Sequence, residues 1–221
     1  MNSLSVLWEF RGAFLSGLAT TGALVGLTAV GGTVLGVALE WLCEENEGFT
    51  RRMVDVVAFC IAAIPALVVL FWLYYPLQNR LSIVVSPFAT ALSTLLVLNT
   101  FSVYRIVADA VHDFPRQYIS TALVCGLSER EITRHIRLPL LTRSTLPRWI
   151  DQQVVILQTS LFASFISVEE IFRVAQRVNS IKYHPVTIYT SMALLFLVTA
   201  GASMYYARVL RTRAYRDTSE R

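Results

Sequence analysis

The chain alternates between long stretches without charged residues and short segments rich in arginine. Five stretches that lack Asp, Glu, Lys and Arg are long enough, or nearly so, to cross a bilayer as a helix, which takes about 20 residues. They are Gly12–Leu39, Val56–Asn79, Leu81–Tyr104, Gln152–Val168 and Tyr183–Ala207. This pattern predicts an all-α, polytopic membrane protein with five transmembrane helices.

We expect a single domain over residues 1–221. Its expected spans are 14–40, 55–77, 84–110, 147–167 and 186–208, with a loop at 113–143. The fourth span is short and contains Gln152, Gln153 and Gln158. These amides are expected to face protein, because a polar group exposed to lipid is costly.

One charged segment, Ser120–Pro139, predicts a helical elbow between the third and fourth spans. Gly126 suits the position after a helix end, where a positive φ is needed. Ser128 and Glu131 have the spacing of a capping box at the start of a second helix. Pro139 is expected to end that helix, because proline has no backbone N–H. Two short capped helices favour a rigid docking element over a lipid-facing one.

The arginines predict how the chain is oriented in the membrane. Five crossings put the two ends on opposite sides, and one side then carries most of the arginines. These are Arg51, Arg52, Arg116, Arg130, Arg134, Arg137, Arg143, Arg148, Arg208, Arg211, Arg213, Arg216 and Arg221. Positive residues favour the cytoplasm. We therefore expect the N-terminus outside, and the C-terminus and the elbow inside.

The composition agrees with a membrane protein and narrows its partners. Hydrophobic residues make up 55% of the chain, and the mean hydropathy is +0.55. The net charge is +4, but the arginines flank apolar spans and form no contiguous basic face. Membrane lipid is therefore the expected partner, and nucleic acid is not. The three cysteines and three histidines lack the spacing of metal ligands, so no metal site is expected.

The first span contains two pairs of glycines four residues apart, Gly22 with Gly26 and Gly32 with Gly36. Small residues at this spacing let helices approach closely in lipid. The glycine pairs could serve packing within the subunit or contact with a second subunit, and we favour packing within the subunit.

The elbow resembles a known signature. Gly126, nine residues, Ile136, one residue and Leu138-Pro139 match the cytoplasmic loop of the permease subunits of binding-protein-dependent ABC importers. In that family, Glu-Ala-Ala comes before the glycine. Here the triad is Ser120-Thr121-Ala122, so its third position alone matches.

Further segments resemble the polar amino acid permeases within this family, and together they extend over nearly the whole chain. They are Phe14–Thr21, Ile64–Tyr75, Thr159–Leu161, Val168–Gln176 and Ile188–Thr190. The resemblance implies a multi-pass protein of the bacterial inner membrane.

The resemblance also implies partners. Two permease subunits would form a pore, two ATPase subunits would bind its cytoplasmic face, and an external binding protein would deliver the amino acid. The elbow would insert into a groove of one ATPase. This chain has no Gly-x-x-x-x-Gly-Lys-Ser/Thr loop, so it is not expected to be an enzyme or to bind a cofactor. ATP and Mg²⁺ would belong to the ATPase subunits.

The elbow supplies the residues that would couple to an ATPase. They are Ser120, Gly126, Leu127, Ile132, Ile136, Leu138 and Pro139. Ile132 and Ile136 lie four apart, on one helical face. We expect them to form an apolar knob in the partner's groove. The alternative is that this face folds back onto the subunit's own spans.

Polar residues near the ends of the third and fourth uncharged stretches are candidates for the substrate pathway, because such residues usually face a bundle interior or an aqueous cavity. They are Asn99, Thr100, Ser102, Tyr104, Arg105, Gln158, Thr159 and Ser160. The planar guanidinium of Arg105 suits a substrate carboxylate. The spacing favours another partner, Asp109, one helical turn away.

A short segment after the fourth span is a candidate external gate. Its charged residues are Glu169, Glu170 and Arg173. The resemblance implies a gate beside the dock of the binding protein, and a solvated interfacial helix is the alternative.

The chain departs from the family at charged positions. Arg105 and Ala108 stand where many relatives have glutamate and arginine, and Leu157-Gln158 stands where Lys-Asp is common. Two hypotheses follow: a subunit that forms the non-binding half of a heterodimeric pore, which we favour, or an altered site that uses Arg105 and Gln158. A secondary transporter and an intramembrane enzyme are disfavoured, because the sequence shows neither a repeated pattern of intramembrane acids nor a nucleophile–base pair.

Overall fold

The computed structural model describes residues 3–46 and 48–219, and within them every regular element is helical. The α-helices are α1 (Ser3–Glu9), α2 (Arg11–Glu45), α3 (Phe49–Ala63), α4 (Ala66–Trp72), α5 (Gln78–Leu81), α6 (Pro87–His112), α7 (Arg116–Val124), α8 (Glu129–Ile132), α9 (Leu138–Ser160), α10 (Ile171–Lys182) and α11 (Pro185–Ser219). Two π-helical turns, η1 (Leu73–Leu77) and η2 (Thr133–Arg137), and one 3₁₀ segment, η3 (Leu161–Ile166), connect some of them. The predicted all-α class is confirmed.

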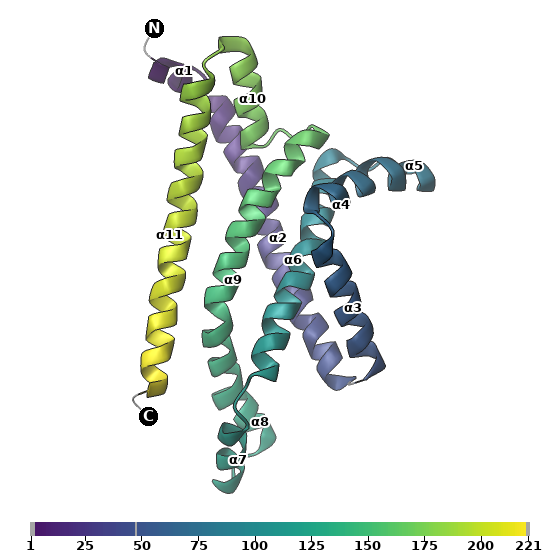
Figure 1. Cartoon of the computed structure of the whole chain (residues 1–221), viewed down its shortest axis with the longest axis vertical. Coiled ribbons are helices and arrows are strands. Elements are labelled where there is room, and N and C mark those ends of the chain that lie inside the picture. Colours follow the sequence, from purple (N-terminus) through teal and green to yellow (C-terminus); the bar gives the residue numbers. More distant parts are fainter. Residues whose placement is uncertain (1–2, 47, 220–221) are drawn as a thin grey trace.

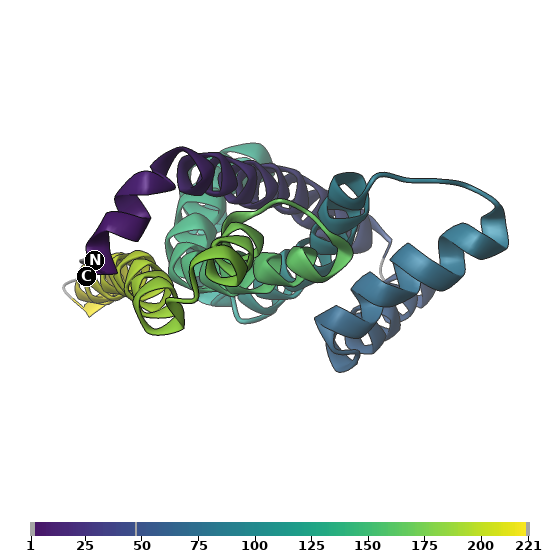
Figure 2. The same ribbon diagram turned by 90° about the horizontal axis from the view of Figure 1, so that it is seen from above.

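The long helices form a flat bundle. Helices α2, α6 and α9 pack against one another at its centre, with α11 along one edge and α3 along the other (Figures 1 and 2). Helix α1 and helix α10 lie at one end of the bundle, and α7, α8 and the end of α11 lie at the other (Figure 1). The two ends of the described chain are therefore at opposite ends of the bundle, as an odd number of crossings requires.

Three of the helices, α2, α6 and α11, are long and apolar enough to cross a membrane without a break. Two bent segments raise the count to as many as five if each bent pair is one span. The expected first, third and fifth spans lie largely within α2, α6 and α11, and the expected fourth span lies in α9 and η3.

The expected second span at 55–77 is not one straight helix. Helix α3 ends at Ala63, and the segment Ala66–Leu81 continues at an angle of 99° to it. The break is at Ile64, whose φ of −87° and ψ of 128° are extended. Steric contact with the ring of Pro65 disfavours a helical conformation at Ile64. As a result, α4 and α5 turn away to one side of the bundle (Figure 2).

The expected helix end at Pro139 is also wrong. The backbone stays helical from Glu129 through η2 into α9, and Pro139 lies in the first turn of α9. Within η2 the Leu138 N–H donates to the Thr133 carbonyl, five residues back. This π turn changes the hydrogen-bond ladder just before the proline, so the missing N–H and the ring are accommodated without a stop.

Glycines set the spacing between α2 and α6. A Cβ atom on Gly36 would lie 2.7 Å from the Thr100 carbonyl oxygen and 2.8 Å from the Val103 Cβ. Gly32 lies equally close to Asn99. The second glycine pair therefore packs within the subunit, whereas Gly22 and Gly26 face open space.

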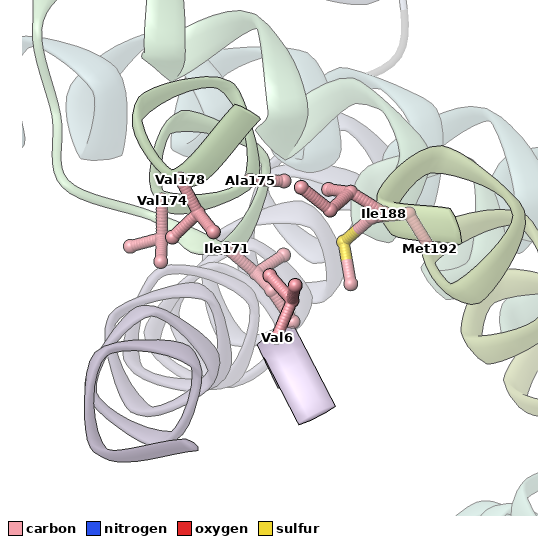
Figure 3. Packing of buried hydrophobic residues seen from close by; sticks show 7 residues of the cluster. All are labelled: Val6, Ile171, Val174, Ala175, Val178, Ile188 and Met192. Carbon is pink, nitrogen blue, oxygen red and sulfur yellow. The ribbon is translucent and has the colours of Figure 1, made fainter. Parts of the chain in front are cut away.

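The end opposite the elbow is held by an apolar cluster that joins α1, α10 and α11 (Figure 3). Its buried members are Val6, Ile171, Val174, Ala175, Val178, Ile188 and Met192. An ion pair between Lys182 and Glu9, 2.8 Å long, adds to this contact. Helix α10 is thereby fixed across the ends of α2 and α11.

Candidate functional site

The elbow has the two caps that the sequence predicts. Gly126 has a φ of +81°, and its N–H donates to the Leu123 carbonyl, while the Leu127 N–H donates to the Ala122 carbonyl. These two bonds make a Schellman motif at the end of α7. At the start of α8, the Ser128 Oγ accepts from the Glu131 N–H, and the Glu131 carboxylate accepts from the Ser128 N–H. The capping box is confirmed.

The same hydrogen bonds affect the ionisation of Glu131. Donation from the Ser128 hydroxyl, 2.6 Å away, and then from the Ser128 N–H lowers the pKa of Glu131 below its usual value. The carboxylate is therefore ionised at neutral pH, and it lies in the first turn of α8, where a negative charge is favourable.

The exposed apolar residues of the elbow are not the ones that the spacing predicts. Ile132, the last residue of α8, is 4% exposed. The expectation that it projects as a knob is therefore wrong, because its side chain is buried within the subunit. At the tip, Val124 is 89% exposed, Leu123 is 52% exposed and Leu127 is 37% exposed. These three residues, called the elbow tip below, flank Gly126.

The sequence contains a signal for the elbow tip, because Leu123 and Val124 come just before the C-capping Gly126. Apolar residues directly before a C-capping glycine lie in the last turn of their helix, where the chain reverses and little covers them. Leu123 and Val124 are both exposed there, which is unusual for an elbow that only contacts water. Together with Leu127, they form a small exposed apolar patch at the end of the elbow.

A cavity of about 950 Å³ lies beneath the elbow, between the end of α6, α7, η2 and the start of α9. Ile136 and Pro139 line it, together with His135, Arg143 and Arg148. Ile136 is half-buried, and it also lines a second cavity of about 470 Å³ with Leu127. The remaining coupling candidates, Ser120 on α7 and Leu138 at the start of α9, are exposed.

Two ion pairs join the base of the elbow to the bundle. Arg137, the last residue of η2, pairs with Glu44 at the end of α2. Arg148 on α9 pairs with Asp109 on α6, with 3.6 Å between Nη1 and Oδ2. The expected pair between Arg105 and Asp109 is therefore wrong. Asp109 pairs with a residue of α9, and Arg105, one helical turn before Asp109, is exposed.

Two of the substrate-pathway candidates are part of the packing. Asn99 is fully buried, and its Nδ2 donates to the Thr28 carbonyl at 2.9 Å, while its Oδ1 accepts from Gln153. Tyr104 is also fully buried, and its hydroxyl donates to Asp55 at 2.7 Å. Both side chains link helices, as polar groups in membrane bundles commonly do.

The other candidates lie in different surroundings. The hydroxyls of Thr159 and Ser160 donate to carbonyls of their own helix. They line a cavity of about 10 Å³, which has room for about one water molecule. Ser102 is half-buried, whereas Arg105 and Gln158 are exposed. The structure therefore does not bring the candidates together into one pocket, and it leaves Arg105 and Gln158 as the accessible polar groups.

The candidate gate residues have separate roles in the structure. Glu170 is fully buried, and its carboxylate accepts from the N–H groups of Phe172 and Arg173 at 2.9 and 2.7 Å. It caps α10. Glu169 is exposed and pairs with Arg177 at 3.0 Å. Arg173 is half-buried. Of this set, Glu169 and Arg173 have side chains that a partner can reach.

Comparison with known protein families shows to which family the chain belongs. Residues 32–214 match the model of the family described as the binding-protein-dependent transport system inner membrane component. The chain belongs to this family. It is therefore a membrane-embedded component of a transport system rather than its ATPase, and the predictions of a permease and of a multi-pass membrane protein are confirmed.

Individual relatives cover almost the whole chain. The glutamine transport system permease protein GlnP of Escherichia coli K12 is 24% identical over 211 residues, which are 95% of this chain and 96% of GlnP. The arginine ABC transporter permease protein ArtQ of Haemophilus influenzae is 25% identical and covers 90% of this chain, with 94% of ArtQ matched. A solved amino acid ABC transporter with histidines has the same fold, with a TM-score of 0.83 at 19% identity over 98% of this chain and 99% of the solved chain.

Proposed function

We propose that this chain is the permease subunit of an ATP-driven importer for a polar amino acid in a bacterial inner membrane. The observation that carries the proposal is the elbow, whose rigid caps present an apolar tip at the end where the arginines gather. The similarity to permeases named for glutamine and arginine supports the substrate class. Positive residues favour the cytoplasm, so the elbow and the C-terminus would lie inside and the N-terminus outside.

The partners follow from this proposal. The elbow tip would dock into an ATPase subunit, and an external binding protein would deliver the amino acid at the end formed by α1 and α10. A second permease subunit would complete the pore, and two ATPase subunits would bind ATP and Mg²⁺. Arg105 on α6 and Gln158 on α9 are both exposed, and each is suited to line the pore, because exposed polar groups in a span are costly against lipid.

Uptake by the reconstituted transporter tests the proposal. Vesicles that contain this chain, its second permease, the ATPase and the binding protein should accumulate radiolabelled glutamine, arginine or histidine when ATP is inside them. Omitting this chain should abolish uptake. Uptake that persists without ATP would rule out an ATP-driven importer. Uptake that persists without this chain would show that the chain is not required for transport.

Within the importer, we propose that this chain is the non-binding half of a heterodimeric pore. Its buried polar groups, Asn99 and Tyr104, are bonded to neighbouring helices, which supports a packing role over substrate contact. The second candidate is an altered site that uses Arg105 and Gln158, and their exposure favours it.

Replacing Arg105 with alanine separates these two candidates. In the non-binding half, Arg105→Ala should leave the KM for uptake within about twofold, because no substrate group loses a partner. In an altered site, the loss of a charged hydrogen bond costs about 1.5–3 kcal/mol, or more than tenfold in affinity. Arg52→Ala, which removes another exposed arginine at the same end, is the control for the loss of positive charge. A tenfold rise in KM for Arg105→Ala alone would contradict the non-binding half.

A further inference from the structure

Three polar contacts run in sequence from the base of the elbow into the bundle. Arg137 of η2 pairs with Glu44 of α2. One turn back on α2, Glu40 pairs with Arg51 of α3 at 3.1 Å. One turn further along α3, Asp55 Oδ1 accepts a hydrogen bond from the hydroxyl of Tyr104 of α6 at 2.7 Å. The three contacts, called the corner relay below, join the elbow to α2, α3 and α6.

Each inner contact of the corner relay has one buried partner, Glu40 or Tyr104, whereas both partners of the outer contact are partly exposed. Glu40 is 2% exposed, and its Oε2 has no hydrogen-bond partner, so its charge depends on Arg51. Tyr104 is fully buried beside Cys43 and Ala58. Arg51 is 28% exposed and Asp55 is exposed, but the loss of either would leave a buried group, Glu40 or Tyr104, without its partner, which is costly. Helices α2, α3 and α6 are therefore expected to move together at this corner.

The outer contact between Arg137 and Glu44 has a different character. Both side chains are partly exposed, at 25% and 36%, and ion pairs in such positions add little to stability. Their position is more informative than their strength. Arg137 ends the π turn that leads from the elbow into α9, and Glu44 lies in the last turn of α2. The pair joins the element that would meet the ATPase to the corner of the membrane bundle.

We propose that Glu44 and Arg137 are positioning residues for energy coupling. Through them, a displacement of the elbow moves the α2–α3 corner, and the contacts Glu40–Arg51 and Asp55–Tyr104 pass this movement to α6. Helix α6 carries the exposed Arg105, so the movement reaches a residue suited to line the pore. This inference rests on the proposed docking of the elbow to an ATPase.

Charge reversal in the assembled transporter tests the corner relay. The measured quantity is the amount of amino acid taken up per ATP hydrolysed in proteoliposomes that contain all subunits. Glu44→Arg and Arg137→Glu should each lower this ratio about tenfold, because like charges would face each other where a pair links the elements. The double variant, with the charges exchanged, should recover to within about twofold. A structural role alone would change the amount of assembled complex and leave the ratio unchanged.

Glu45→Arg is the matched control, since Glu45 is exposed and lies one residue from Glu44. It should keep the wild-type ratio. If a reversed variant does not assemble, the neutral variants Glu44→Gln and Arg137→Gln replace it, and the loss in their double variant should not exceed the larger single loss. Additive losses, an unrecovered exchange variant or single variants with a wild-type ratio would each overturn the corner relay.

The elbow variant Val124→Asp distinguishes a failure of this inference from a failure of the proposed function. If Val124→Asp leaves the ATPase bound and uptake intact, the elbow does not dock, and the corner relay is overturned with it. If Val124→Asp releases the ATPase while Glu44→Arg leaves the ratio unchanged, the docking stands and the corner relay alone is wrong.

Discussion

Val124→Asp is expected to release the ATPase from the purified transporter and to abolish ATP-dependent uptake. Val124 is 89% exposed at the end of α7, so an aspartate there meets water in the free subunit and should not disturb its fold. In the complex, the carboxylate would be buried against an apolar groove without a partner. A central interface position of this kind is worth about 2 kcal/mol or more, which weakens binding about thirtyfold. Co-purification of the ATPase with the tagged permease measures the effect.

Val84→Asp is the control for this prediction. Val84 is 99% exposed in the link between α5 and α6, far from the elbow, so the same change of side chain occurs in an equally open place. It should leave the amount of bound ATPase unchanged. Equal retention of the ATPase by both variants would show that the elbow tip is not the docking surface.

Gly36→Ala is expected to destabilise the subunit itself. The new Cβ would lie 2.7 Å from the Thr100 carbonyl oxygen and 3.0 Å from the Tyr104 N, and backbone atoms in the middle of α6 cannot move aside cheaply. Overpacking of this kind costs about 1–3 kcal/mol. The midpoint of SDS-induced or thermal unfolding of the purified subunit should fall accordingly.

Gly22→Ala is the matched control on the same helix. Nothing lies within 4 Å of a Cβ at Gly22, and the gain in helix propensity from glycine to alanine, about 1 kcal/mol, is the same for both variants. The propensity therefore cancels when the two are compared, and the difference in unfolding free energy should be about 1–3 kcal/mol. Two variants of equal stability would contradict the close contact between α2 and α6.

The local features of the elbow could be predicted because neighbouring residues decide them. The positive φ of Gly126 and the capping box of Ser128 and Glu131 depend on backbone groups a few residues away. The long uncharged stretches likewise predict membrane helices, because the length of a helix and its lack of charge are properties of the segment alone.

Other features needed the positions of distant residues. The pairing of Asp109 depends on Arg148, which α9 brings to α6, and the spacing within α6 pointed to Arg105 instead. The exposure of Ile132 and Val124 depends on how α7 and α8 pack. The periodicity of a single helix does not contain this information. The stop expected at Pro139 is wrong for a local reason: the Leu138 N–H donates to the Thr133 carbonyl, five residues back, and the helix continues through this π turn.

By itself, the sequence determined the all-α class, the apolar stretches long enough to cross a membrane, the caps of the elbow and the likeness to a family of permeases, because these depend on local pattern and on spacing along the chain. Only the tertiary structure decided which residues of the elbow are exposed, and that Arg137, Glu44, Glu40 and Arg51 meet at one corner. Burial and ion pairing depend on which helices are neighbours, and segments nearly a hundred residues apart become neighbours only when the bundle packs.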